Sequence, residues 1–545
     1  MNRARSASLL GIVIAAAACS GPPVTTDAGD ASTGDATRDV VANDTGRDVT
    51  TGDADRDSGI DVVIATDSGT DAPSAMDSGA DSGADAGFDA TGDTGGSDAG
   101  PILGSGTSYY VSNAGNDTND GRSPATAWQT LRRVEMAQRT VRAGDNILFR
   151  RGDSFAGTLY WSNQFGHTAP SGTAADPITF ATYGSGARPI FQYPPLTSTS
   201  PDARYRVLFN FEGVDYIVID GFDITDLVFP RNDHDTPANC GIGLSFGGYP
   251  DVFSDHCVVR NTTMSNIGMG VVLVGHYNTI ENNSITDLKN VYSTPADPSR
   301  PGSEYDDYGA NAITITGHDN LIAHNYLSGA WASSADFTWN GGAIEAFGSV
   351  SSNRIVYNTI VDCGGIIEFG SLTTGDMSVD NVIAYNLMIA NGALSWVNAS
   401  GPFATAVTNI QFFNNTIVDV SNRFGDSTMF GYSSTTAAGT TYNLRNNIFY
   451  LSSGLDVSST RYAPRTVHEN NVYHLSGSSV AGYTLNASER NTTAALFVDT
   501  TGTDPTTWNY DLLPASPARG AGSDLGFTET LTGAPVSSPP NAGAY

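Results

Sequence analysis

The sequence predicts an all-β fold, a solenoid of short parallel strands stacked coil upon coil. The first observation is an asparagine that recurs in eight short segments between positions 258 and 474. The aligned residues are Asn261, Asn283, Asn325, Asn358, Asn386, Asn415, Asn447 and Asn471. Their spacing runs from 22 to 42 residues, as expected for a coil of constant length with loops of variable length. The second observation is that apolar and polar residues alternate within these segments, which show no helical periodicity.

The recurring asparagine has a structural role in this prediction. A single coil cannot bury its apolar face, whereas stacked coils enclose one long core. An asparagine at the same turn of every coil can bond its amide to the coils above and below and so satisfy backbone groups of the turn. We therefore expect none of these asparagines to be catalytic.

The first 19 residues have the pattern of an export signal. Arg3 and Arg5 precede the apolar run LLGIVIAAAA, which is too short to span a membrane as a mature helix. The run ends at Cys19 in the sequence AAAC, which resembles a bacterial lipoprotein cleavage box, although Ala16 stands where that box usually has leucine. The resemblance implies lipidation of Cys19 and attachment to a membrane without a spanning segment. The alternative is an ordinary cleaved signal with an incidental cysteine.

Residues 20–103 are expected to be a disordered linker. Residues 20–100 contain 18 Asp and 3 Arg among Gly, Ala, Ser and Thr, and too few large apolar side chains to offset the entropy of ordering the chain. The whole sequence has a net charge of −31, and Lys289 is its sole lysine. Such a charge repels nucleic acid, so a nucleic-acid partner is excluded.

Residues 104–545 are expected to form the solenoid domain. The segment WQTLRRVEMAQRT at 128–140 is the one predicted helix, which we expect to cap the open end of the core. The acidic run GNDTNDG at 115–121 is typical of a turn, with calcium binding as the alternative. Export permits a disulfide between Cys240 and Cys257, which sequence alone leaves open. No cysteine and histidine spacing resembles a zinc site.

Three further stretches connect the domain to a known superfamily. They are YYVSNAGNDTNDGRSPATAWQTL near the start, GTAADPITFATYGSGARPIF after it, and YDLLPASPARGAGSDLG near the end. Together they resemble the terminal signatures of exported right-handed parallel β-helix proteins of the pectate-lyase-like superfamily, over roughly residues 107–545. The resemblance implies a single-stranded right-handed parallel β-helix that acts on a polysaccharide. These signatures are specific for the fold and weak for the substrate.

Two near-identical segments, GGAIEAFG at 341–348 and GGIIEFG at 364–370, each place one glutamate in an apolar run. Glu345 and Glu368 are 23 residues apart, which is one coil, so we expect them on adjacent strands about 4.8 Å apart. Alternation turns their apolar neighbours inward and both carboxyl groups outward. Two carboxylates this close cannot both ionise cheaply, and a split pair of pKa values is what a glycosidase uses. A separation of about 5 Å corresponds to retaining chemistry.

Insertions beside this pair supply further candidate site residues. Loops at 290–309 and 329–342 would wall the binding face, as insertions in solenoids do. Candidates for the second catalytic carboxylate are Asp306, Asp307 and Asp336. Candidates for binding substrate are Tyr305, Tyr308, Trp331, Trp339, Trp396 and Lys289. Calcium held by Asp306, Asp307 and Glu345 is the alternative function of the acidic cluster.

Three functions compete at the sequence level. The paired glutamates favour hydrolysis of a polysaccharide, which needs no cofactor. A uronan lyase would need calcium on this acidic face and a base such as Lys289. A non-catalytic glycan-binding or adhesin-like surface protein is the third alternative. In all three cases we expect a monomer that is lipid-anchored at the cell surface or outer membrane, or otherwise secreted.

Overall fold

The computed structural model describes most of the predicted solenoid domain. The described residues are 103–164, 166–196, 207–229, 240–248, 252–294, 306–334, 338–398, 405–432, 442–452, 454–459, 463–480 and 482–545. The export signal, Cys19 and the linker up to residue 102 lie outside them, so those expectations remain predictions.

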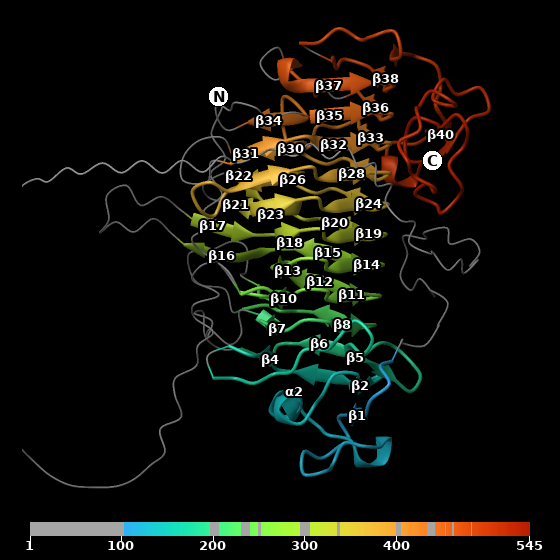
Figure 1. Ribbon diagram of the computed structural model, residues 1–545. Coiled ribbons are helices and arrows are strands. Elements are labelled where there is room, and N and C mark those ends of the chain that lie inside the picture. Colours follow the sequence, from blue (N-terminus) through green and yellow to red (C-terminus); the bar gives the residue numbers. More distant parts are fainter. Residues whose placement is uncertain are drawn as a thin grey trace, which may run out of the picture. The chain divides into compact units, whose positions relative to one another are not determined.

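Three long parallel sheets run the length of the described domain and form the sides of a β-helix (Figure 1). The first sheet contains β1 (Ser108–Val111), β2 (Asn146–Arg150), β5 (Ile178–Tyr183), β8 (Ile217–Asp220), β11 (Val258–Arg260), β14 (Thr279–Glu281), β19 (Leu321–Ala323), β24 (Arg354–Val356), β28 (Val382–Ala384), β32 (Ile410–Phe413), β35 (Tyr442–Arg445) and β37 (Thr466–Glu469). The second contains β4 (Leu159–Ser162), β7 (Val207–Glu212), β10 (Ile242–Phe246), β13 (Met269–Val274), β18 (Asn311–His318), β23 (Gly342–Ser351), β26 (Gly365–Gly370), β30 (Ala393–Val397) and β34 (Phe430–Tyr432), with β27 (Met377–Val379) and β31 (Ala406–Thr408) beside them. The third contains β3 (Ser154–Ala156), β6 (Ile190–Gln192), β9 (Asp223–Thr225), β12 (Thr263–Ile267), β15 (Ser284–Leu288), β20 (Tyr326–Ser328), β25 (Thr359–Val361), β29 (Leu387–Ile389), β33 (Thr416–Asp419), β36 (Ile448–Leu451), β38 (Val472–Leu475) and β39 (Arg490–Asn491). Successive coils thus contribute one strand to each sheet, which confirms the predicted fold class.

The predicted helix lies at the N-terminal end of the stack and is shorter than expected. It consists of α2 (Leu131–Met136) followed by the 3-10 turn η2 (Ala137–Arg139). The side chain of Thr130 caps it by accepting a hydrogen bond from the amide of Arg133. Leu131 and Val134 are buried in the main hydrophobic core, so the helix covers the first coils as solenoids require. The described residues also form the short 3-10 turns η1 (Pro124–Thr126), η5 (Ala463–Arg465) and η6 (Pro505–Thr507).

The asparagine ladder is confirmed with one correction. From Asn283 to Asn471 the seven predicted asparagines form a continuous buried chain in which each Nδ2 donates to Oδ1 of the next. The last, Asn471, donates to Oε1 of Glu489, which ends the chain. Asn261 is not a member, because it is the left-handed turn residue (φ 54°) and Thr262 occupies the ladder position. A second ladder, through Asn278, Asn320, Asn353 and Asn381, was not predicted.

The structure also describes the domain's three cysteines and its acidic run at 115–121. Cys240, Cys257 and Cys363 are buried, and the described residues contain no disulfide between Cys240 and Cys257. The acidic run at 115–121 is a turn in which Asp117 accepts hydrogen bonds from Gln129 and Thr130 of its own chain. No helix in the described part of the chain is long and apolar enough to cross a membrane.

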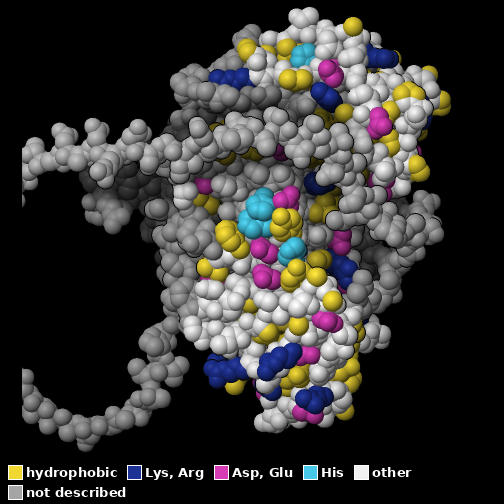
Figure 2. All heavy atoms as spheres, viewed as in Figure 1, with side chains coloured by type: hydrophobic (Ala, Val, Ile, Leu, Met, Phe, Trp, Pro, Cys, Tyr) yellow, Lys and Arg dark blue, Asp and Glu magenta, His cyan; other side chains and the backbone are white. Residues whose placement is uncertain are grey.

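In the described part of the chain, three two-stranded antiparallel elements lie beside the main sheets. They are β16 (Asn290–Thr294) with β17 (Asp306–Gly309), β21 (Ala332–Ser334) with β22 (Thr338–Asn340), and β40 (Phe497–Asp499) with β41 (Asn509–Leu512). The first two are the predicted insertions, and both rise next to the second sheet (Figure 1). On the face shown in Figure 2, Lys and Arg side chains are scattered, whereas acidic and histidine side chains gather near the middle.

Candidate active site

The two glutamates lie side by side in the second sheet, as the sequence predicts. Glu345 of β23 is the register partner of Glu368 of β26. Their neighbours Ile344, Ala346 and Phe369 belong to the buried core, so the two carboxyl groups face outward. One coil before Glu345 the register partner is Thr314, and one coil after Glu368 it is Trp396. The outward face of this sheet therefore carries a column of polar and aromatic side chains that runs along the helix axis.

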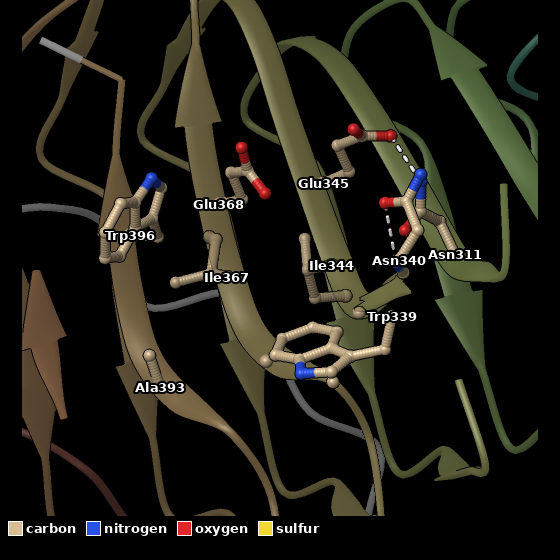
Figure 3. Close-up of a pocket in the computed structure, with 13 residues that line it drawn as sticks. Asn311, Trp339, Asn340, Ile344, Glu345, Ile367, Glu368, Ala393 and Trp396 are labelled. Carbon is tan, nitrogen blue, oxygen red and sulfur yellow. Dashed lines mark hydrogen bonds between the residues drawn. The ribbon is translucent and has the colours of Figure 1, made fainter. Parts of the chain in front are cut away.

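A pocket opens over this column at the start of the strands (Figure 3). Both carboxyl groups lie on the same face, with Trp396 beyond Glu368 and the ring of Trp339 on the side where the strands begin. The lining residues are Asn311, Trp339, Asn340, Gly341, Gly342, Ile344, Glu345, Gly364, Gly365, Ile367, Glu368, Ala393 and Trp396. The two glycine pairs of the repeated segments thus form part of the pocket, next to the two glutamates. The lining contains two carboxyl groups and no Lys, Arg or His among the described residues.

Glu345 is in an unusual electrostatic state. It is only 5% exposed, which the sequence did not indicate for an outward-facing residue. Burial raises the pKa of its carboxyl group to about 8, with a further contribution from the charge of Glu368, and the hydroxyl of Thr314 opposes the shift. Glu345 is therefore protonated at neutral pH, while Glu368 is half-buried at the pocket surface. Two carboxyl groups in one pocket thus have different environments, which is how proteins separate an acid from a nucleophile or base.

Each glutamate accepts a hydrogen bond from an asparagine that sequence analysis missed. Nδ2 of Asn311, at the start of β18, donates to Oε2 of Glu345 (Figure 3). Nδ2 of Asn398, just after β30, donates to Oε1 of Glu368 over 2.8 Å. Both asparagines are buried. Neither belongs to a ladder repeat, so the sequence carried no periodic signal for them.

Two tryptophans border the pocket, and glycines position both. A Cβ atom on Gly364 would lie 2.5 Å from Cζ3 of Trp339, so the indole ring occupies the space a side chain would fill. Trp339 comes from β22, and its ring packs edge-on against Phe424 with centroids 5.1 Å apart. Trp396 lies similarly against Gly431. Both residues thus line the pocket, and their role in binding substrate remains a prediction.

Three other predicted substrate-binding residues lie elsewhere. Trp331 is absent from the lining and stacks under the guanidinium of Arg423, 4.5 Å from the ring centroid. Tyr308 is 4% exposed and packs in a small cluster with Met269 and Val272, because the hairpin folds its own aromatic residue inward. Lys289 forms an ion pair with Asp287 and does not line the pocket. None of these three residues lines the described pocket, and their role in binding substrate remains a prediction.

The structure describes little of the predicted aspartates and of Tyr305. Tyr305 and Asp336 lie outside the described residues, as do the side chains of Asp306 and Asp307, whose backbone forms β17. Their catalytic, binding or calcium-binding roles remain predictions. Within the described residues no group of three or more His, Cys, Asp or Glu is arranged to hold a metal ion.

Several solved structures share this architecture. The pectate lyase Pel9A is 17% identical, with a TM-score of 0.50 over 81% of this chain and 97% of that one. A rhamnogalacturonan lyase is 16% identical, with a TM-score of 0.42 over 67% and 87% of the two chains. A lacto-N-biosidase of family GH136 from Eubacterium ramulus is 15% identical, with a TM-score of 0.41 over 68% of each chain. Neither a protein-family model nor a curated protein matches the sequence.

The likeness to Pel9A and the three stacked parallel sheets define the fold of the protein. It is a right-handed parallel β-helix, as the sequence predicts. At such low identity the likeness establishes the fold alone, so the activity has to be argued from the pocket.

Proposed function

We propose that this chain is a carbohydrate-active enzyme that hydrolyses a polysaccharide in the pocket around Glu345 and Glu368. One observation carries the proposal: a nearly buried carboxyl group with a pKa of about 8 lies in register beside a second, more exposed carboxyl group. A protonated acid next to an ionised carboxylate is the pair that glycosidases require. Trp339 and Trp396 offer apolar rings beside it, suited to packing against sugar rings.

In the proposed mechanism Glu345 is the general acid and Glu368 the nucleophile. Glu345 gives its proton to the glycosidic oxygen as the bond to the anomeric carbon breaks, and Glu368 attacks that carbon to form a glycosyl ester. Water then attacks the same carbon, loses a proton to Glu345 and releases Glu368 as carboxylate. Neighbouring parallel strands are about 4.8 Å apart, which supports the retaining geometry of about 5 Å.

The composition of the pocket favours this reaction over elimination. A uronan lyase has to neutralise the uronate carboxylate and to remove the adjacent proton with a base. The described lining residues supply no cationic side chain, and the sole lysine is paired with Asp287. A calcium ion could supply the missing charge, so the test below includes a chelator. An uncharged sugar needs no such neutralisation and suits a pocket lined by carboxyl, amide and indole groups.

The experiment is a screen of the full chain against a panel of neutral and uronate polysaccharides, with and without chelator. Hydrolysis yields new reducing ends without ultraviolet-absorbing products, whereas elimination yields an unsaturated uronide that absorbs. Glu345→Gln and Glu368→Gln should each lower kcat by at least about 1000-fold while retaining the fold. Full activity in both variants would overturn the proposal. Retention of a polysaccharide on a native gel without any product would indicate a glycan-binding surface protein.

We also propose that the chain is tethered to the cell surface or outer membrane by lipid on Cys19, with the linker as spacer. The support is the sequence of the export signal alone. Metabolic labelling with a radioactive fatty acid should mark the wild-type chain and leave Cys19→Ala unlabelled. Equal labelling of both would refute the anchor, and a secreted form is then expected.

A further inference from the structure

The hydrogen bond between Asn311 and Glu345 distinguishes the two oxygens of the acid. Asn311 is 5% exposed and occupies the first position of β18, where it is the register partner of Gly342 in the next coil. Gly342 has no side chain at that position, and the amide of Asn311 reaches Oε2 of Glu345. In Figure 3 the other oxygen, Oε1, points away from Asn311 toward the Glu368 side.

An amide N–H is a donor and cannot accept a hydrogen bond. A proton on Oε2 of Glu345 would therefore face the N–H of Asn311 and is disfavoured there. Glu345 protonated at neutral pH therefore carries its proton on the other oxygen. We propose that Asn311 is a positioning residue that fixes the acid proton of Glu345 on Oε1, the oxygen that faces Glu368 and the substrate. This inference rests on the proposed function, since it assigns an orientation to the acid of that reaction.

The backbone before Asn311 explains why the asparagine is held there. Ala310 has a positive φ of 58°, and its amide hydrogen is shared by the carbonyl groups of Gly268 and Lys289. This turn fixes the chain at the point where β18 begins. An asparagine on such a rigid element loses little entropy when it orients a catalytic group.

A substrate-free experiment tests the inference. The full chain contains nine glutamates, so selective labelling of the side-chain carboxyl carbon gives few signals in a 13C spectrum. The signal of Glu345 is assigned by its loss in Glu345→Gln. Leucine has the same number and branching of side-chain heavy atoms as asparagine, with larger methyl groups and no N–H donor, so Asn311→Leu removes the hydrogen bond while keeping the site filled. Because that N–H favours the charged carboxylate, its loss should raise the pKa of Glu345 by roughly 0.5–1 unit.

The matched control is Asn398→Leu, which removes the donor from Glu368 and should leave the Glu345 midpoint within roughly 0.3 unit of wild type. Asn311→Ala is the second variant should leucine prevent folding, which the melting temperature reports. An unchanged or lower Glu345 pKa in a folded Asn311 variant would overturn the inference. On the polysaccharide found in the screen, Asn311→Leu should lower kcat about tenfold with KM nearly unchanged, because the proton matters only in bond cleavage.

The two proposals fail in different ways. If Glu345→Gln and Glu368→Gln retain activity, the hydrolase proposal fails whatever the titration shows. If both lose activity while Asn311→Leu leaves the Glu345 titration unchanged, only the positioning role is lost.

Discussion

Trp396 lies against Gly431, its register partner in the next coil. A Cβ atom on Gly431 would be 2.6 Å from both Cε3 and Cζ3 of the indole, a distance that real Cβ contacts do not show. A Cβ atom on Gly364 would likewise be 2.5 Å from Cζ3 and 2.8 Å from Cε3 of Trp339, although these two residues are not register partners. Neither Gly431 nor Gly364 has a positive φ, so the backbone conformation does not require glycine at either position. Both tryptophan rings bordering the pocket are thus seated on positions without side chains.

Replacing Gly431 by alanine should therefore move the ring of Trp396. The Cβ atom would force the indole to tilt away from its present seat while the strand pairing stays intact. If the ring packs on substrate, Gly431→Ala should raise KM roughly fivefold, which corresponds to about 1 kcal/mol of lost stacking. Steady-state kinetics on the polysaccharide found in the screen provides the measurement, and Trp396→Ala is the matched variant. A change in Trp396→Ala without any change in Gly431→Ala would show that ring position is unimportant.

The raised pKa of Glu345 predicts how activity depends on pH. The acid works only when protonated, so kcat should hold through neutral pH and fall as the pH rises through about 8. Replacing Glu368 by Gln removes the neighbouring charge, so the Glu345 midpoint should fall below 8 but stay above its ordinary 4.5 because burial remains. The pH–rate profile of the wild type and the carboxyl 13C titration of Glu368→Gln measure the two effects. A Glu345 midpoint that is unchanged in that variant would contradict the assigned cause.

The raised pKa of Glu345 also predicts that the folded state becomes less stable as the pH rises. The pKa of Glu345 is about 8 in the folded chain and near 4.5 when unfolded, so the unfolded state loses its proton first as the pH rises. Stability should therefore decline between pH 4.5 and 8, by up to about 5 kcal/mol at 1.36 kcal/mol per pKa unit. Glu345→Gln has no proton to lose and should escape this decline. Melting temperatures at pH 4.5 and 8.5 should diverge in favour of the variant; parallel curves would show that the carboxyl group is not buried as described.

The fold could be predicted from the sequence because its determinants are periodic. One coil repeats the same apolar alternation and the same turn asparagine, so the ladder from Asn283 to Asn471 is visible as a spacing. The prediction of the ladder failed in its first segment, where the ladder position was assigned one residue too early. In VVRNTTM the asparagine takes the left-handed turn position, which asparagine also favours, and Thr262 takes the ladder position. A pattern of residue types cannot separate two neighbouring positions that favour the same side chain.

The site was predictable only in its periodic part. The repeated GG-x-x-E segments and strand alternation place Glu345 and Glu368 in one outward column, and the register confirms it. Burial of Glu345 and the hydrogen bonds from Asn311 and Asn398 depend on residues outside the repeat, so sequence offered no signal for them. Tyr308 shows the opposite error, since an aromatic residue in an insertion can pack inward as readily as it can face a ligand.

Acid should destabilise the described domain through His276. Its ring stacks on that of His318 with centroids 3.7 Å apart, on the polar outer face. Burial lowers the pKa of His276, the neighbouring His318 lowers it further, and Asp255 and Asp319 oppose the shift. The folded state thus binds this proton less readily than the unfolded state, so stability present above pH 6.5 is lost as the pH falls through the lowered pKa.

The measurement is the melting temperature of wild type and His276→Gln at pH 7.5 and pH 5. The wild type should lose roughly 1–3 °C more than the variant between the two conditions, a small effect because the ring is partly solvated. His318→Gln should reproduce part of the gain, since it removes the second ring of the stack. Identical losses in all three chains would exclude this pair as a source of acid sensitivity.

The ladder itself predicts a sharp difference between two asparagines that look alike in the sequence. Asn358 is completely buried, and its Nδ2 donates to Oδ1 of Asn386 and to the carbonyl groups of Ile322 and Val356. Its Oδ1 accepts from the backbone amide and the side chain of Asn325. Asn358→Ala leaves several of these buried groups without partners and should cost about 3 kcal/mol or more of unfolding free energy.

Asn261 provides the matched control because it occupies the turn position outside the ladder. It is exposed, and its side chain makes one hydrogen bond, to Asp220, in the described structure. Asn261→Gly keeps the positive φ accessible, so the cost should stay below about 1 kcal/mol. Denaturant unfolding of both variants measures the difference. If the two substitutions lower the free energy of unfolding equally, the hydrogen bonds between ladder asparagines contribute little to stability. Packing of the apolar core alone would then hold the coils in register.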